Sequence, residues 1–402
     1  MIDSKISEPH YVVMIKKIVL LLLISCSTLT YAQSNYLILD NASKKVPYSL
    51  KSSNAIALEL TKKLNTDIEK TRAIYIWITH NISYDYALLE NLPKYTSSKD
   101  LVEYVLKKRT GVCQHYADLF LDMTQSIGLE TFLIAGYTRD YKDSIATISH
   151  AWNAIKIDSK YYFIDTTWSA GYIKEGRFVR SFNDKYFLIR PEDFIKTHIA
   201  FDPIYQFLPS PIRHIDFQEK NFDKLDLDKK YLFEDILNKT SSLDTITKLK
   251  KSISRIIKCG VTNDMTKKVI DNNLNKITSI EFRAVIDTLN YGIDNYNKYI
   301  ESKNNKFKNP KLSDADIKEL IDSASTGFYA SNQLILGLSS TNRELSKAIN
   351  FEKNRLPTLI DSVDLEKEFV TKYLKKWKPL RGIMFYNYKP NTVHKSKRIP
   401  LF

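Results

Sequence analysis

Three residues of the types used in thiol acyl-transfer chemistry follow one another along the sequence. Cys113 lies in the segment RTGVCQHYA, His150 begins HAW, and Asp165 begins DTTW. A thiol is mostly protonated near neutral pH, so it needs a base beside it, and the base needs a carboxylate that orients it. The order and setting of the three residues therefore predict a nucleophile, a base and an orienting group.

A helix is expected to begin at Cys113. Apolar residues recur at helical spacing around and after it, and the run ends at Gly128. These residues are Val112, Tyr116, Leu119, Phe120, Met123 and Ile127. The unpaired amides and the positive dipole end of a first helical turn favour a thiolate. The backbone amide of Cys113 is also a candidate donor to an oxyanion.

Strands are predicted after this helix, over residues 131–137, 150–157 and 161–167. Asp158 and Ser159 are typical of a two-residue turn between the last two strands. In that register Asp165 lies opposite Trp152 and is a diagonal neighbour of His150. A three-residue loop would instead put His150 and Asp165 on opposite faces. The sequence permits the productive register without requiring it.

The segments GVCQHYADLF, IAGYT and SHAWNAIKIDSKYYFIDTTWSAGY together resemble the transglutaminase-like superfamily, and more narrowly the bacterial kyphoscoliosis-peptidase-like cysteine protease domains. The resemblance continues upstream through 72–85 and downstream through 198–208. It implies an α+β fold with a papain-like transglutaminase core, in which the helix bearing the cysteine packs on an antiparallel sheet. It further implies that Cys113 is the nucleophile, His150 the base and Asp165 the orienting carboxylate.

Four further residues near these three are candidates for the walls of a substrate cleft: Gln114, His115, Trp152 and Trp168. Gln114 could donate to an oxyanion. Many members of the family carry glycine where this chain has His115, which affects the expected shape of the cleft, although a side chain at this helical position favours the direction away from the nucleophile. The two tryptophans are interpreted as core or cleft-wall aromatics. His198 is interpreted as structural.

Neither a metal nor a cofactor is predicted. The sequence has no Cys-x-x-Cys pair, and His80, His115, His150 and His198 lack the spacing of metal ligands. Only 10 of the 402 residues are glycine, and no glycine-rich phosphate loop occurs. A nucleotide cofactor is therefore not expected.

The N-terminus predicts export. Met14 and two lysines precede an apolar run over 18–24, and small residues follow as far as Ala32. Residues 1–32 are accordingly interpreted as a signal peptide whose natural start is Met14. The apolar run is too short for a stable membrane span. The protein is expected in the periplasm or outside the cell. Cys26 also fits a lipoprotein cleavage site, so a lipid anchor on this residue is the alternative.

The length predicts two domains, because single cores stop growing near roughly 250 to 300 residues. Residues 36–215 are assigned to a transglutaminase-like cysteine catalytic domain. Beyond Phe217 strand-like runs disappear, so 216–402 is predicted to be an all-helical domain with a basic C-terminal tail. The sequence has only three cysteines, which argues against a disulfide scaffold. Cys259 is predicted to be buried rather than paired with Cys113.

The charge distribution is compatible with an anionic partner, although charge runs are more often solvated surface. The formal net charge is +14, and all charged residues from Lys372 to Arg398 are basic, with aromatic residues between them. This tail could meet an anionic cell-envelope polymer or a membrane surface. The alternative is a solvated tail without a partner. Nucleic acid is not expected as a partner of an exported protein.

Together the sequence predicts an exported cysteine peptidase, amidase or acyltransferase that forms a thioester with a protein or peptide substrate. Peptide hydrolysis, glutamine deamidation and crosslinking use the same triad. Hydrolysis is favoured because water is the default acceptor unless a site excludes it. The alternative is a non-catalytic cell-envelope module that binds peptide or glycan on the same fold, and an intact triad argues against it.

Overall fold

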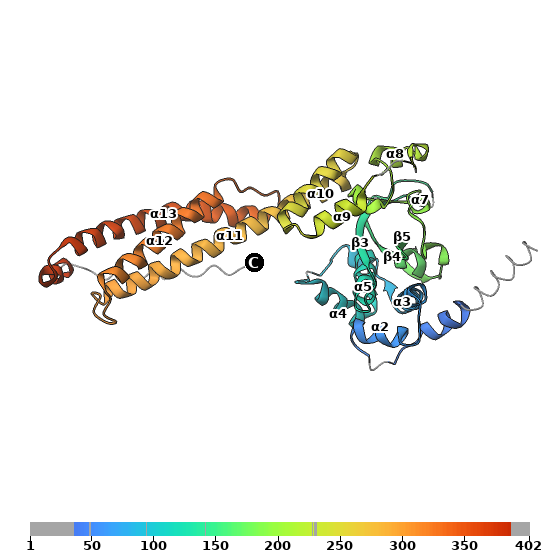
Figure 1. Cartoon of the computed structure of the whole chain (residues 1–402), viewed down its shortest axis with the longest axis horizontal. Coiled ribbons are helices and arrows are strands. Elements are labelled where there is room, and N and C mark those ends of the chain that lie inside the picture. The colour runs from blue at the N-terminus through green and yellow to red at the C-terminus, as the bar shows by residue number, and fades with distance from the viewer. Residues whose placement is uncertain are drawn as a thin grey trace, which may run out of the picture. The chain divides into compact units, whose positions relative to one another are not determined.

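The computed structural model describes residues 36–47, 50–93, 95–140, 142–226, 228 and 231–386. The chain divides into two compact units (Figure 1). The first comprises Met1–Asn238 and Cys259–Met265, and the second comprises Lys239–Lys258 and Thr266–Phe402. The first unit thus continues past residue 215, where the sequence analysis ended the catalytic domain. The predicted signal peptide over 1–32, with Met14 and Cys26, lies outside the described residues.

The helical layer of the first unit is formed by α2 (Ser53–Thr61), α3 (Asp67–Asn81), α4 (Ser98–Lys108) and α5 (Cys113–Gln125). Polar caps fix where α2, α3 and α4 begin. Thr66 and Glu69 form a capping box at the start of α3, and the side chain of Ser97 accepts a backbone N–H at the start of α4. The buried faces of the helices join one core, which includes Trp77 from α3 and Phe120 from α5.

An antiparallel sheet of four strands packs against this layer. It consists of β3 (Thr131–Thr138), β4 (His150–Ile157), β5 (Lys160–Ile164) and β8 (His198–Ala200), in the order β5-β4-β3-β8. Residues of α5 and residues of β4 and β5 belong to the same buried cluster; they are Leu119, Phe120, Met123, Ile155, Ile157 and Ile164. The predicted fold class, a cysteine-bearing helix on an antiparallel sheet, is confirmed.

The hairpin between β4 and β5 has the register that was predicted for a two-residue turn at Asp158 and Ser159. Ile157 pairs with Lys160, and the two residues between them have φ angles of 47° and 62°, as a two-residue turn requires. The predicted third strand over 161–167 is wrong at its end, because β5 stops at Ile164. Asp165 instead caps α6 (Thr166–Ala170), and this local capping bond replaces further strand pairing.

Shorter elements complete the first unit. Two two-stranded sheets occur: β1 (Ser83–Tyr84) is parallel to β2 (Thr110–Gly111), and β6 (Gly171–Lys174) is antiparallel to β7 (Arg177–Arg180). Further helices are α7 (Pro191–Phe194), α8 (His214–Gln218) and α9 (Phe233–Ser241), and the boundary between the two units falls within α9, after Asn238. Single 3₁₀ turns lie at Ala87–Leu89, Asp184–Tyr186, Pro203–Gln206 and Phe222–Lys224.

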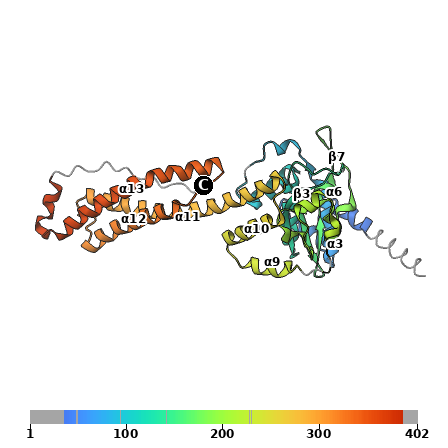
Figure 2. The same ribbon diagram turned by 90° about the horizontal axis from the view of Figure 1, so that it is seen from above.

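The second unit is helical, as predicted. It contains α10 (Thr245–Cys259), α11 (Asp264–Asn304), α12 (Asp314–Ile335), α13 (Arg343–Lys375) and the 3₁₀ helix η5 (Lys378–Phe385), and Figure 2 shows the three longest helices side by side. Glycines allow α11 and α12 to approach closely, since a Cβ on Gly327 would lie 2.6 Å from the Cα of Gly292. In the part of the chain that the structure describes, no helix has an apolar stretch long enough to cross a membrane.

Candidate active site

Cys113 is the first residue of α5, as the sequence predicts, and its side chain is half-buried. Two features hold the backbone on its N-terminal side. Strand β2 pairs with β1, and the ring Nδ1 of His115 accepts the backbone N–H of Val112 at 3.3 Å. Gly111 leaves room for that ring, since a Cβ there would lie 2.5 Å from the Cβ of His115. The thiol therefore sits at the positive end of a well-anchored helix.

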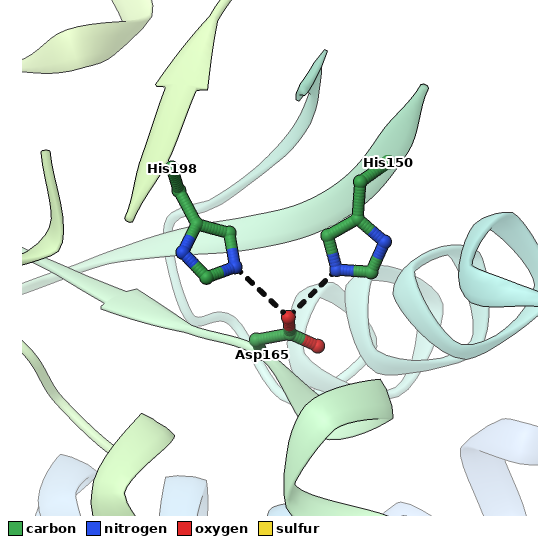
Figure 3. Close-up of side chains that lie close together, drawn as sticks. All are labelled: His150, Asp165 and His198. Carbon is green, nitrogen blue, oxygen red and sulfur yellow. Dashed lines mark hydrogen bonds and ion pairs between the residues drawn. The ribbon is translucent and has the colours of Figure 1, made fainter. Parts of the chain in front are cut away.

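His150 and Asp165 meet across the hairpin (Figure 3). His150 Nε2 lies 2.7 Å from Asp165 Oδ2, and the carboxylate is completely buried. The other oxygen, Oδ1, accepts the backbone N–H groups of Thr167 at 2.8 Å and Trp168 at 3.0 Å. These bonds fix the carboxylate at the start of α6. The carboxylate in turn fixes the ring of His150 at the start of β4.

Cys113 completes the arrangement on the other side of His150. The side chain of His150 and the backbone of Ala151 lie near the thiol and lower its pKa. Because Nε2 of His150 is used by Asp165, Nδ1 is the nitrogen available to the sulfur. The structure thus joins His150 to Asp165 and places the thiol of Cys113 near His150.

The electrostatics of this group favour charged partners. Burial alone would raise the pKa of Cys113, but the hydrogen bond and charge of His150 outweigh it and lower this pKa. Burial would lower the pKa of His150, whereas Asp165 and then Cys113 raise it to about 10. Burial would likewise raise the pKa of Asp165, and the two neighbouring histidines lower it instead. Both shifts favour a thiolate beside an imidazolium.

A second histidine reaches the same carboxylate, which the sequence analysis did not anticipate. His198 Nε2 lies 3.2 Å from Asp165 Oδ2, and its Nδ1 is 2.8 Å from the hydroxyl of Thr197. Burial lowers the pKa of His198 to about 4, so the ring is neutral and donates one proton to the carboxylate. The ring also stacks on Phe194 at 4.0 Å between centroids. The only local signal for His198 in the sequence was that a polar residue begins the apolar strand segment HIAF.

His150, Asp165 and His198 could together be read as a metal site, because their donor atoms lie within 4.8 Å of one another. The geometry favours hydrogen bonds instead. Ligands of a tetrahedral zinc ion stand about 3.3 Å apart when each bond is about 2.0 to 2.1 Å long. The 2.7 Å separation between His150 Nε2 and Asp165 Oδ2 is shorter and is typical of a charge-assisted hydrogen bond.

The predicted cleft residues fall into different places. Gln114 is half-buried and donates to Asp118 Oδ2 at 2.6 Å, so its amide is directed along α5. His115 is buried, and its Nε2 lies 2.7 Å from the hydroxyl of Tyr95. Burial lowers the pKa of His115 to about 4. This ring packs in the interior and supports the helix start, and does not lie on an accessible cleft wall.

The two tryptophans lie beside the imidazoles. Trp152 is buried, with its ring centroid 5.9 Å from that of His150 and 5.2 Å from that of His198. Trp168 is half-buried, 5.7 Å from His150 and 4.5 Å from His198. The aromatic rings therefore surround both imidazoles and reduce the access of water to them.

Tyr84 is a residue that the sequence analysis did not single out. It pairs with Gly111 across β1 and β2, and its hydroxyl lies near the backbone amide of Cys113. Burial raises its pKa, so the hydroxyl keeps its proton. Its ring lies 6.4 Å from that of Tyr116. The hydroxyl is thus held next to the backbone amide of the candidate nucleophile.

The other described cysteine is separate from this group. Cys113 and Cys259 are both free thiols, and the Cys259 thiol donates to the carbonyl of Ile212 at 3.4 Å. Burial raises the pKa of Cys259 to about 12. The prediction of a buried Cys259 not paired with Cys113 is confirmed.

Comparisons with known proteins relate part of this chain to one superfamily. Residues 54–166 match the family model described as the transglutaminase-like superfamily. Kyphoscoliosis peptidase of Homo sapiens is 28% identical over 177 residues, which are 41% of this chain and 26% of that protein. Cytokinesis protein 3 of Schizosaccharomyces pombe is 28% identical over 170 residues, 40% of this chain and 19% of that protein.

The matched part of the chain thus spans about a quarter of the length of kyphoscoliosis peptidase and less of the yeast protein. Among solved structures, the crystal structure of a TGase is 17% identical, with a TM-score of 0.24, and the match covers 41% of this chain and 42% of that one. The chain therefore contains a domain of the transglutaminase-like superfamily, matched over residues 54–166.

Proposed function

We propose that the protein is a cysteine-dependent amide-bond hydrolase or acyltransferase. Cys113 attacks an amide carbonyl of a protein or peptide substrate and forms a thioester, and the proton on His150 passes to the leaving amine. The observation that carries this proposal is the position of His150 between the thiol of Cys113 and the buried carboxylate of Asp165. An acceptor then attacks the thioester with His150 as base.

The oxyanion of the tetrahedral intermediate needs donors close to the sulfur. The backbone N–H of Cys113 is the first donor, as the start of a helix supplies it. We assign the hydroxyl of Tyr84 as the second, because it lies beside that same backbone amide and keeps its proton. Tyr84→Phe keeps the ring but removes the hydroxyl. It should lower kcat about 10- to 100-fold and leave the alkylation rate of Cys113 unchanged.

The acceptor decides between hydrolysis and transamidation. Cys113 and Trp168 are both partly exposed, so the site as a whole is not closed off from solvent. We therefore favour water as the acceptor and peptidase or amidase activity as the outcome. Deamidation of glutamine and crosslinking to an amine use the same intermediate, and mass spectrometry of the products distinguishes them.

The decisive experiment compares wild type, Cys113→Ala and Cys259→Ala on an unfolded protein substrate, with cleaved peptides and new amide crosslinks measured by mass spectrometry. Activity should be lost in Cys113→Ala and retained in Cys259→Ala, which is the matched thiol control. Equal turnover by wild type and Cys113→Ala would refute the mechanism. Peptide binding without turnover in any variant would indicate the non-catalytic module instead.

Export to the periplasm or the exterior is proposed from the sequence alone, on the basis of the segment 14–32. The N-terminus of the protein recovered from its native cells tests this proposal. Cleavage after Ala32 corresponds to a soluble exported form, and a lipid-modified Cys26 to an anchored form. An N-terminus at or before Met14 would exclude both.

A further inference from the structure

A row of apolar side chains is exposed at the C-terminal end of the described helical unit. The four residues of this row are Trp377, Leu380, Ile383 and Tyr386, and their exposed fractions are 71%, 43%, 62% and 89%. Such exposure of a tryptophan and three further large side chains within ten residues is unusual for a surface that meets only water. These four side chains are therefore candidates for a contact surface.

The backbone aligns these four residues on one side. They are spaced by three along η5 and its two caps, and i→i+3 hydrogen bonds join Leu380 to Trp377 and Tyr386 to Ile383 at 2.9 and 3.0 Å. A 3₁₀ helix has three residues per turn, so side chains three apart lie above one another. The four side chains consequently form one continuous stripe, which we call the apolar row.

The opposite side of η5 is anchored to the helical unit. Phe385 is buried against Phe307 and Tyr373, with ring centroids 6.0 and 5.9 Å apart. Arg381 lies over the ring of Tyr373 at 4.9 Å and pairs with Asp314 at 2.6 Å. The apolar row is thus presented on a fixed support, as an element built for docking requires.

Cations flank the apolar row. Lys375, Lys376 and Lys378 are exposed on either side of Trp377, and no acidic residue occurs from 372 to the end of the sequence. Lys372 is neutralised by Glu368, and Arg381 by Asp314. Among the described residues, no ion pair is formed by Lys375 or Lys376. The net charge beside the row is therefore positive.

We propose that the apolar row and its lysines dock on an anionic lipid bilayer. An anionic polymer would satisfy the lysines but would leave Trp377, Leu380 and Ile383 in water. The boundary between headgroups and acyl chains satisfies both, because tryptophan and tyrosine prefer that depth and lysines bind the anionic headgroups. The commitment to a lipid surface thus rests on the apolar row and on charge complementarity together.

The test measures binding of the full-length chain to vesicles of phosphatidylglycerol and phosphatidylcholine, and to vesicles of phosphatidylcholine alone. Every variant keeps the same N-terminus, so any contribution of the apolar segment 18–24 is common to all. Binding should require the anionic lipid and weaken with salt. Changing Lys375, Lys376 and Lys378 to glutamine should weaken it about 100-fold, at roughly fivefold per lysine.

The apolar contribution is tested separately. Trp377→Ala with Ile383→Ser should weaken binding at least about tenfold, whereas Leu365→Ser, which removes a residue 68% exposed elsewhere on α13, should not. Brominated lipid should quench the fluorescence of wild type more than that of Trp377→Phe, because Trp377 is the most exposed tryptophan, whereas Trp77 and Trp152 are buried and Trp168 is half-buried. Equal quenching, no vesicle binding, or equally tight binding to dextran sulfate without dependence on Trp377 would overturn the proposal.

Discussion

The most direct prediction concerns the reactivity of the two thiols with iodoacetamide. At pH 6 to 7, Cys113 should be alkylated and Cys259 should not. Only the thiolate reacts, and His150 lowers the pKa of Cys113 while burial raises that of Cys259 to about 12. Cys259 is therefore an internal control in the same molecule, exposed to the same reagent for the same time.

The size of the difference follows from the pKa of Cys259 and from the direction of the shift at Cys113. At pH 7 a thiol with a pKa of about 12 has a thiolate fraction on the order of 10⁻⁵, whereas an ordinary thiol is about 3% ionised and His150 increases that fraction for Cys113. A thiolate of lower basicity is less nucleophilic, with a Brønsted slope of about 0.4 to 0.5, which removes roughly half of the logarithmic advantage. The remaining ratio is at least about 100, and the burial of Cys259 increases it.

Two variants distinguish the effect of the thiolate–imidazolium pair on the reactivity of Cys113 from the effect of the helix start. His150→Gln removes the imidazolium, which should raise the thiol pKa and slow alkylation at pH 6 about 3- to 30-fold, because the more basic thiolate that remains is also the better nucleophile. Asp165→Asn should act in the same direction, because the imidazolium loses its counter-charge, and should lower turnover by about 10 to 10³. The thiolate–imidazolium pair should persist over the pH range between the pKa of Cys113 and that of His150, which is about 10. An unchanged alkylation profile in His150→Gln would refute the ion pair.

Three further predictions test the surroundings of the site. His198→Gln removes a neutral donor to the carboxylate, so the carboxylate should hold the proton on His150 more strongly. The alkaline limb of kcat/KM against pH should then move upward, with a loss of rate of no more than about tenfold; a profile of unchanged shape would leave His198 a packing residue. Gly136→Ala should lower the unfolding free energy by at least about 2 kcal/mol in a denaturant titration, because the new Cβ would lie 2.1 Å from a carbonyl of β8. The buried rings of His115, His198 and His214 have a pKa of about 4, below that of an unfolded histidine. The stability that they contribute is present above pH 6.5 and lost as the pH falls to 4, at up to roughly 3 kcal/mol per histidine, and His115→Gln should flatten that slope in thermal melts.

Local patterns predicted the elements that carry the three central residues. The apolar period of 3.6 after Val112 indicated the helix that begins at Cys113. The bounds 150–157 of β4 were predicted in full, since alternation and a clear turn signal mark both ends. Asp158 and Ser159 then set the register that brings His150 to Asp165. Each of these features depends on neighbours within a few residues, which the sequence displays directly.

Features that depend on distant contacts were missed. His198 comes beside Asp165 only because β8 pairs with β3, where Thr138 lies opposite His198. The ring of His115 turns inward because Gly111 leaves space and Tyr95 offers a hydroxyl. Tyr84 reaches Cys113 through the pairing of β1 with β2. No periodicity or spacing along the chain encodes such meetings, since they arise from packing.

Asp165 shows why the fold and the candidate chemistry depend on one another. A buried carboxylate is costly unless its lone pairs are satisfied, and an ionised one offers about four acceptor sites. Here two backbone N–H groups of α6 use Oδ1, and His150 and His198 use Oδ2. The same four bonds that stabilise the buried charge also start α6, join β5 to β4 and β8, and orient the imidazole. A change that shifts the start of α6 must therefore also shift the ring of His150, so activity should respond to perturbations of this short helix as strongly as stability does.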